Sequence, residues 1–180
     1  MELPPKIYNS VKIGAQGDFD IVVGLTRDLV EQQKKYSADD SDTDLQRFTK
    51  DKMRFVHGSY ENWYKKVRTP FALVERKTGT LAATVRVGPN ALFEEKDDWH
   101  TVAWRSYRPF RGTGIMKNFT KVVLDFYKKN YPDAKLWATI TRDNVGSIKL
   151  AEKLGFVADD SRSKRKTEER RREVLVMINQ

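Results

Sequence analysis

The sequence contains no cysteine and only two histidines, His57 and His100. The absence of cysteine excludes disulfide bonds, cysteine nucleophiles and thiolate-bound zinc. Two histidines alone make a poor metal site, so we expect no metal. No apolar run approaches the roughly 20 residues of a membrane-spanning helix, and the start of the chain lacks the basic and then apolar layout of a secretory signal. We therefore expect a cytoplasmic protein without a membrane contact.

Apolar and charged residues are both abundant. The 180 residues are 39% hydrophobic and 33% charged, which is typical of a folded protein, and the length suits one domain, which we expect to span residues 1–180. The net charge of +9 favours an anionic partner, which is a phosphate-bearing cofactor, a nucleic acid or an acidic protein. Residues 161–173 carry seven Lys or Arg against three Glu. We interpret them as a loop inserted in a hairpin, either solvated or in contact with phosphate or an acidic substrate.

The first third of the chain is predicted to contain a short strand and several helices. Alternation of Val11 and Ile13 indicates the strand, and apolar residues every four positions then predict a helix capped by Asp18. The apolar positions of that helix are Ile21, Leu25 and Leu29. Residues 44–57 and 60–67 are typical of one broken helix or two short ones, with a break at Gly58.

The remaining pattern alternates strands and helices. Two strand-like runs joined by Arg76–Gly79 predict a hairpin. Beyond it we expect a strand at 99–106, an amphipathic helix at 115–130, a strand at 135–141, a helix from Asp143 or Asn144 to Gly155, and a last strand at 173–178. Strand, glycine loop, helix and strand form a crossover unit, so the strands 99–106 and 135–141 should pair in parallel. We predict a mixed α/β (α+β) domain with a largely antiparallel sheet.

The glycine loop lies in the stretch "YRPFRGTGIMKNF", residues 107–119. Gly112 and Gly114 allow close approach of the backbone where a strand turns into a helix, and the free N–H groups of that helix attract anions. Arg111 adds a full positive charge. Taken alone, the motif is either a phosphate cradle or a structural turn. The spacings of a Walker A loop and of a dinucleotide fingerprint are both absent.

A second motif bears on the interpretation of the glycine loop. "RGTGIMKNF" resembles the pyrophosphate loop R/Q-x-x-G-x-G/A of the GNAT superfamily of acyl-CoA N-acetyltransferases, with Arg111 and Gly114 in the first two fixed places. "DNVGSIKLAEKLGF", residues 143–156, resembles the family's second signature, an Asn followed by a helix that closes with Glu-Lys-Leu-Gly-Phe. The two motifs occur in the family's order, separated by one helix and one strand, and a hairpin precedes them. The chain therefore resembles this family over nearly its whole length.

The resemblance implies a site for acetyl-CoA as co-substrate. The strands 99–106 and 135–141 would splay apart, and the pantetheine arm would lie between them, paired with backbone groups near Trp104 and Ser106. Main-chain N–H groups of residues 111–116 would hold the pyrophosphate: Arg111, Gly112, Thr113, Gly114, Ile115 and Met116. Asn144 would either contact the cofactor or only cap its helix. The same two alternatives hold for Ser147.

Acyl transfer to an amine requires a neutral amine, an oxyanion donor and a proton for the leaving thiolate. His100 is the candidate base, since some family members place a Glu or His on this strand; the alternative is a strand-end histidine without a chemical role. An N–H near Ser106 is the candidate oxyanion donor. Weaker candidates for the base, acting through water, are Glu75, Glu94, Glu95, Asp97 and Asp98.

Two positions depart from the family pattern. Met116 stands where the loop usually has a small residue, and we expect it to crowd the pyrophosphate. Many members carry a Tyr acid where this chain has Ala151. Tyr107 or Tyr127 would have to replace it, or the thiolate leaves without a dedicated acid.

The resemblance implies an N-acetyltransferase that passes an acetyl group to a primary amine by direct attack in a ternary complex. The acceptor is a small molecule or a protein, and the acidic residues in the 88–99 loop indicate a cationic one. Tyr60, Trp63 and Tyr64 line its site or belong to the core. The alternatives are a catalytically silent CoA-binding domain and a basic nucleic-acid-associated module. The oligomeric state is predicted as monomer or homodimer.

Overall fold

The computed structural model describes residues 1–66, 68–94, 98–170 and 172–179. Its eight strands form one sheet in the order β1-β2-β3-β4-β5-β6-β8-β7. The strands are β1 (Val11–Gln16), β2 (Phe19–Val23), β3 (Thr69–Glu75), β4 (Leu81–Pro89), β5 (Trp99–Ser106), β6 (Lys135–Thr141), β7 (Val157–Asp159) and β8 (Val174–Asn179). The helices are α1 (Arg27–Ala38), α2 (Thr43–Phe48), the π-helix η1 (Lys52–Val56), α3 (Tyr60–Tyr64), α4 (Ile115–Asn130), α5 (Val145–Lys153) and α6 (Asp160–Arg170). The described residues contain no helix that is long and apolar enough to cross a membrane.

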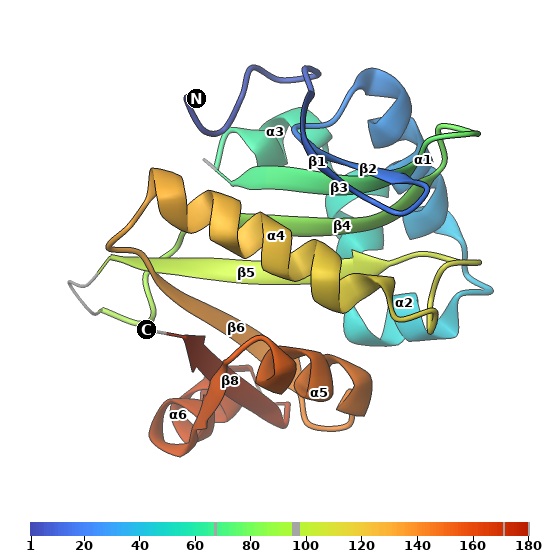
Figure 1. Ribbon diagram of the computed structural model, residues 1–180. Coiled ribbons are helices and arrows are strands. Elements are labelled where there is room, and N and C mark those ends of the chain that lie inside the picture. Colours follow the sequence, from blue (N-terminus) through green and yellow to red (C-terminus); the bar gives the residue numbers. More distant parts are fainter. Residues whose placement is uncertain (67, 95–97, 171, 180) are drawn as a thin grey trace.

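The pairing of β5 and β6 sets the shape of the sheet. They are parallel, whereas the other neighbouring strands are antiparallel, which confirms the predicted mixed sheet with its crossover pair. Only residues 99–101 of β5 and 135–137 of β6 are paired. Beyond them the two strands diverge, and β6 leads away toward β8 and α5 (Figure 1). We call residues 99–101 and 135–137 the closed end, and residues 102–106 and 138–141 the open end.

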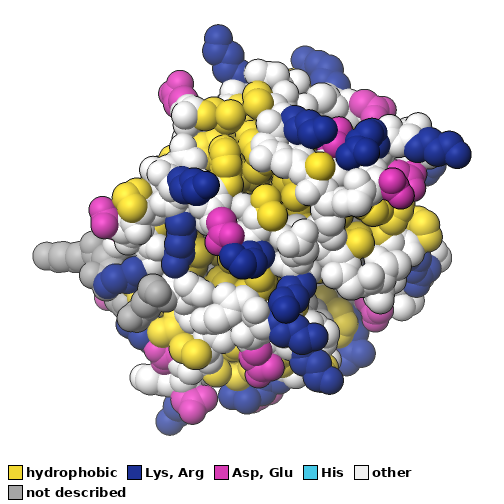
Figure 2. Space-filling view, in the orientation of Figure 1, with side chains coloured by type: hydrophobic (Ala, Val, Ile, Leu, Met, Phe, Trp, Pro, Cys, Tyr) yellow, Lys and Arg dark blue, Asp and Glu magenta, His cyan; other side chains and the backbone are white. Residues whose placement is uncertain are grey.

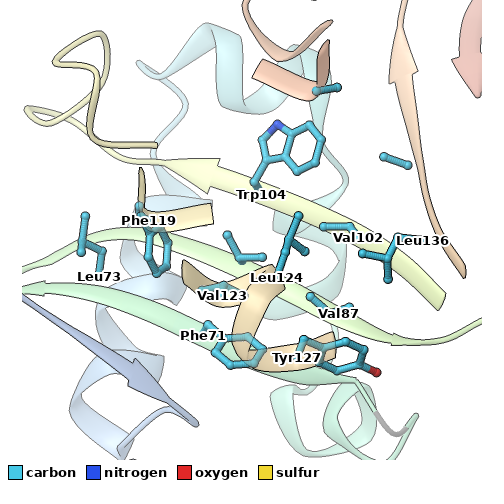
Figure 3. Packing of buried hydrophobic residues seen from close by; sticks show 14 of the residues in the cluster. Phe71, Leu73, Val87, Val102, Trp104, Phe119, Val123, Leu124, Tyr127 and Leu136 are labelled. Carbon is cyan, nitrogen blue, oxygen red and sulfur yellow. The ribbon is translucent and has the colours of Figure 1, made fainter. Parts of the chain in front are cut away.

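Helix α4 covers one face of the sheet, while α1 and α3 lie behind it (Figure 1). The predicted amphipathic pattern of α4 is confirmed, because Phe119, Val123 and Tyr127 are fully buried in the main hydrophobic core. Figure 3 shows these side chains packed over Phe71 and Val87 of the sheet. Burial of each such side chain contributes about 1.5–3 kcal/mol. A second core on the opposite face joins α1, η1 and α3 to the sheet.

The predicted helix from Asp18 is wrong in its first half. Residues 19–23 form β2, with Ile21 and Val23 fully buried between β1 and β3, and α1 begins only at Arg27, after the N-cap Thr26. The β-branched run Ile-Val-Val favours a strand, and Gly24 with a φ of +83° separates strand from helix. The apolar residues four positions apart therefore belong to two different elements, Ile21 to β2 and Leu29 to α1.

The segment after α1 is more broken than predicted. Residues 43–56 form two pieces, α2 and η1, and Asp42 caps α2 through the N–H of Leu45. The predicted break near Gly58 is confirmed, because Ser59 caps α3 through Asn62. The extra break lies at residues 49–51, where Asp51 turns into the interior.

Residues 161–170 of the basic segment belong to helix α6, which corrects their interpretation as a loop. Lys, Arg and Glu are good helix formers, and Asp159 accepts from the N–H of Arg162 in the first turn of α6. The short strand β7 before it was not predicted. β7 and β8 pair antiparallel, so α6 is the connection within a hairpin. Its Ser163 accepts a hydrogen bond from the N–H of Val176 on β8 at 2.8 Å.

Candidate active site

The divergence of β5 and β6 opens a cavity of about 560 Å³. Both strands line it, together with the end of α2, η1, β4, the start of α5 and the end of α6. Trp104, Asn144 and Ser147 are among the lining residues, as the resemblance implied. The cavity therefore joins the end of β5 to the second sequence motif, whereas Ser106 and the glycine loop are not among its lining residues.

The backbone of β5 turns unpaired polar groups toward this cavity. In an antiparallel ladder, alternate residues direct their N–H and C=O to the same neighbouring strand. Trp99 and Tyr107 bond to Asn90 and Ala82 on the β4 side, so the even-numbered residues face β6. At the open end, where the pairing with β6 has stopped, the N–H groups of Trp104 and Ser106 thus lack a strand partner among the described residues.

The facing edge of β6 has the same property. The N–H of Lys135 donates to Asp98 at the closed end, so odd-numbered residues of β6 face β5. Thr139 is one of them, and its buried side-chain hydroxyl has no hydrogen-bond partner within the described part of the chain. At the open end the two strands thus face each other without pairing, as an inserted extended ligand requires, although the C=O groups of Trp104 and Ser106 accept from Arg105 and Arg111.

The glycine loop lies where β5 leads into α4. Gly112 and Gly114 both have a φ of +82°, and a Cβ added at either one would meet no atom within 4 Å. Helix α4 begins after Gly114 without a side-chain cap. The first N–H groups of an α-helix have no intrahelical partners, and the positive end of the helix dipole lies behind them. Thr113 is held in the turn by donating its hydroxyl to the C=O of Phe110 at 2.6 Å.

Arg111 anchors this loop through hydrogen bonds to Asp42 and Ser106. Its guanidinium donates to both carboxylate oxygens of Asp42 at 2.7 Å each and to the C=O of Ser106 at 3.0 Å. The hydrogen bond from Arg111 holds the pKa of Asp42 below its ordinary value, and the same bond raises the pKa of Arg111. The sequence motif identified Arg111 but not Asp42, which lies 69 positions away.

Met116 does not crowd the loop as expected. Its side chain and that of Ile115 pack against the hydrophobic core. Gly112, Thr113 and Gly114 remain exposed. The loop is open although a large residue stands in its last fixed place.

Asn144 and Ser147 connect α5 to the cavity. Asn144 caps α5 by accepting from the N–H of Ser147 at 3.2 Å, and the hydroxyl of Ser147 accepts from the indole N–H of Trp104 at 3.3 Å. Trp104 is 8% exposed and packs edge-on against Phe156. Figure 3 shows it at the margin of the core, directed away from α4. The capping role of Asn144 is thus present, and its amide group still lines the cavity.

His100 lies at the closed end, 2% exposed, and is not among the residues that line the cavity. Its Nδ1 is 2.7 Å from the hydroxyl of Tyr127, and its Nε2 is 2.7 Å from Asp98. Burial raises the pKa of Tyr127. Both ring nitrogens are engaged, so the geometry favours a positioning role for His100.

The other predicted acids and bases also lie elsewhere. Glu75 accepts from Thr78, and Glu94 is exposed. Glu95 and Asp97 lie outside the described residues. Tyr107 is fully buried, stacks on Tyr36 with ring centres 4.5 Å apart, and has a pKa raised by burial. Among the described residues that line the cavity there is no tyrosine and no histidine.

The aromatic residues predicted near the acceptor belong to the core. Tyr60 and Trp63 are buried in the second core, and Tyr64 packs against it. The guanidinium of Arg86 lies 5.6 Å from the centre of the Trp63 ring. They support the cavity wall from behind instead of lining it.

A buried charge cluster in the cavity wall was missed by the sequence analysis. Asp51, 1% exposed, accepts from Arg105 Nε at 2.8 Å, Arg86 Nη2 at 3.0 Å and Arg54 Nη1 at 3.1 Å. Burial opposes the ionisation of Asp51, but Arg105 and Arg86 outweigh burial and hold its pKa well below the ordinary value. The cluster joins η1, β4 and β5 at the cavity.

Comparison with known proteins agrees with this geometry. The family model described as "Acetyltransferase (GNAT) domain" matches residues 24–157. A search of curated proteins by sequence finds no match.

Solved structures share the fold at low sequence identity. A ribosomal-protein-S5-alanine acetyltransferase from Vibrio fischeri superposes with a TM-score of 0.68 at 14% identity, over 94% of this chain and 96% of that chain. A spermidine N-acetyltransferase from Vibrio cholerae, solved with CoA and spermine, gives 0.65 at 12% identity, over 91% and 94%. A domain from Methanocaldococcus jannaschii gives 0.64 at 20% identity, over 90% and 99%.

The fold of these structures is the fold described above, and the matched family model covers most of the chain, from Gly24 through both motifs. The chain belongs to the GNAT acetyltransferase family.

Proposed function

We propose that this protein transfers an acetyl group from acetyl-CoA to the primary amine of an acceptor, by direct attack in a ternary complex. One observation carries the proposal: β5 and β6 are paired only at the closed end, the cavity beyond it is lined by both strands and by the start of α5, and the exposed glycine loop follows the end of β5. A long, flexible ligand with amides along its length and a pyrophosphate at one end matches that layout.

The residues present fit acetyl-CoA. The N–H groups of residues 111–116 would hold the pyrophosphate, since α4 has no side-chain cap there. The backbone of Trp104 and Ser106 and the unpartnered hydroxyl of Thr139 would pair with the pantetheine arm. Asn144 and Ser147 would contact it from α5. Bound in this way, acetyl-CoA supplies a thioester carbonyl that an amine can attack.

The acceptor approaches from the side of the cavity lined by η1, β4 and the end of α6. Its nitrogen lone pair forms the new C–N bond, and the C–S bond breaks with its electron pair going to sulfur. The nitrogen gives up one proton, and the sulfur gains one. The N–H of Ser106 is the proposed oxyanion donor, because it lies at the open end of β5 without a strand partner among the described residues.

Water carries the proton in this proposal. Glu169 is the carboxylate on the described cavity wall, and the hydrogen bond from Lys166 at 2.7 Å lowers its pKa, which makes it a weak base. His100 would act through a water chain or not at all, because its ring nitrogens are bonded to Tyr127 and Asp98. That it is the base stays a prediction.

A catalytically silent CoA-binding domain remains a second candidate. It is favoured by the absence of a phenol from the described cavity wall and by Ala151, which is fully buried. The two candidates share the co-substrate site and differ in the transfer step. Release of thiol from acetyl-CoA in the presence of a panel of amines separates them.

The co-substrate site is tested by calorimetric titration with CoA. Gly114→Val adds a side chain at a positive φ above the loop, and we expect CoA to bind at least tenfold more weakly. Gly79→Val is the matched control, since Gly79 has a φ of +71° and equally open surroundings in the β3–β4 turn, away from the cavity. Absence of CoA binding to the unmodified protein at millimolar concentration would refute the proposal.

A further inference from the structure

The acceptor side of the cavity is strongly basic. The basic side chains that line it are Lys50, Arg54, Arg68, Arg86, Arg105, Arg170 and Arg172. Glu169 is the acidic residue among the described lining residues. On much of the α4 face, by contrast, Lys and Arg side chains are interleaved with Asp and Glu, apart from one basic group in the lower right of the view (Figure 2). The positive charge in the cavity is therefore a local feature and not only a share of the overall +9.

Part of this charge is buried without full compensation. Asp51 contacts the guanidinium groups of Arg86 and Arg105, whose side chains are 4% and 16% exposed, and that of the exposed Arg54, so one buried carboxylate faces two largely buried positive charges. The side chain of Arg86 is 4% exposed, and its buried Nε has no hydrogen-bond partner among the described residues. Buried charges are stable only when paired. The cluster thus has room for a further anion.

Arg68 adds a charge without a counter-ion. It lines the cavity and is half-buried, and no hydrogen bond or ion pair joins its side chain to the described part of the chain. Burial lowers the pKa of Arg68, and the charge of Arg86 lowers it further. An anion bound near Arg68 and Arg86 would offset the repulsion between the two positive charges and supply a counter-ion. We refer to Arg54, Arg68, Arg86 and Arg105 as the arginine pocket.

The arginine pocket is separate from the proposed pyrophosphate site. Arg86 and Arg105 direct their side chains to Asp51 beside η1, on the face of the sheet opposite α4. The glycine loop leads into α4 on the other face. The phosphates of the co-substrate and the arginine pocket therefore lie on different sides of the open end.

We propose that the acceptor amine carries an anionic group, a carboxylate or a phosphate, close to its nitrogen, and that the arginine pocket binds this group. The inference rests on the proposed acetyl transfer and specifies its acceptor. It replaces the cationic acceptor that was expected from the acidic residues of the 88–99 loop. Residues 95–97 of that loop lie outside the described part of the chain, and Asp98 is bonded to His100.

The same charges bear on proton removal. Positive groups near an ammonium ion disfavour its protonated form and lower its pKa. An amine held beside the arginine pocket is therefore neutral at a lower pH than in water. This lowered pKa is consistent with Glu169, a weak base, as the base on the described part of the cavity wall.

Matched acceptors test the inference through released thiol. An α-amino acid is compared with its methyl ester and its decarboxylated amine, and phosphoethanolamine with ethanolamine. We expect kcat/KM to be at least tenfold higher for the anionic member of one pair, and the pair that responds distinguishes carboxylate from phosphate. Equal or faster acetylation of the neutral amines or of spermidine would overturn the inference while leaving the acetyl transfer established.

Variants of the pocket give the corresponding test on the protein. Arg68→Gln should raise KM for the anionic acceptor about tenfold and leave the affinity for CoA within twofold. Arg76→Gln is the control, because Arg76 pairs with Asp20 on the surface and does not line the cavity. An unchanged KM in Arg68→Gln would contradict the proposal.

A binding measurement keeps the inference separate from activity. Inorganic phosphate and glutarate at millimolar concentration should raise the Tm of the unmodified protein and of Arg76→Gln more than that of Arg68→Gln. If CoA does not bind but the anions act in this way, the acetyl transfer fails and the anion pocket stands. If neither anion gives a larger shift in the unmodified protein than in Arg68→Gln, the pocket is refuted.

Discussion

The two ends of β5 have the same strand conformation but opposite hydrogen-bonding states. At the closed end, β5 pairs with β6, and both ring nitrogens of His100 have partners. At the open end, the N–H groups of Trp104 and Ser106 have no strand partner among the described residues, and Trp104 lines the cavity. Unsatisfied polar groups are costly in a folded protein and are retained where a ligand completes them. We therefore propose the open end as the site, although the closed end contains the residue type that is most familiar in catalysis.

A second contrast runs across the open end itself. On the α4 side the site offers main-chain groups and a helix terminus. On the η1 side it offers charged side chains around Asp51. Main-chain groups suit a fixed co-substrate, whereas side chains change readily with the acceptor. Three substitutions test these contrasts.

The largest effect is expected at Asp51. Asp51→Asn leaves three guanidinium groups without their shared carboxylate, which should lower the free energy of unfolding by about 3–5 kcal/mol in urea titrations. Asp44→Asn is the control, because Asp44 is exposed and lies 3.8 Å from Arg111, and should change the free energy by less than about 1 kcal/mol. A small effect at Asp51 would mean that solvent screens the cluster.

The effect of Asp51 should also depend on pH. Because its pKa in the folded protein is lowered, its contribution is present above the pKa of the unfolded state, about 3.9. The contribution is lost as the pH falls below that value. The stability difference between the unmodified protein and Asp51→Asn should therefore shrink between about pH 4 and pH 2.

An intermediate effect is expected at the closed end. His100→Gln should lower stability by about 1–3 kcal/mol through its lost contacts with Tyr127 and Asp98, and change kcat less than about threefold. A base at this position would instead lower kcat by a factor of about 10²–10⁴ and remove the acidic limb of the pH–rate profile. The measured pH profile of the variant decides between these roles.

The smallest effect is expected at Ser147. Ser147→Ala removes one hydroxyl from the cavity wall and the bond from Trp104, so CoA should bind about threefold to tenfold more weakly. Ser41→Ala, at an exposed position away from the cavity, should leave the affinity unchanged. Equal affinities of the two variants would place the pantetheine arm away from α5.

Local patterns predicted the parts of the fold that depend on local sequence. The period of α4, the glycine loop, the cap at Asn144 and the β3–β4 hairpin follow from neighbouring residues, and the structure contains all four. Strand β2 was predicted as helix because Ile21 and Leu25 have a helical spacing by coincidence. Pairing with β1 and β3 makes this segment a strand. Helix α6 was interpreted as a loop because charge alone does not distinguish a loop from a solvated helix.

The residues of the candidate site were likewise predictable only where they belong to a local sequence pattern. Trp104, Asn144 and Ser147 were named from the sequence and line the cavity, whereas the glycine loop does not, and the role of these residues stays a prediction. The Asp51 cluster was not predictable, since Asp51, Arg86 and Arg105 come from three elements and meet only through the fold. His100 was nominated by residue type and strand position, and neither shows that its ring nitrogens already have partners.

Amide hydrogen exchange measured with and without CoA tests the central claim most directly. The account predicts that CoA slows the exchange of the Trp104 and Ser106 amides at the open end. The His100 amide at the closed end, already paired in the sheet, should not change. Exchange at Trp104 and Ser106 that is unaffected by saturating CoA would contradict the account.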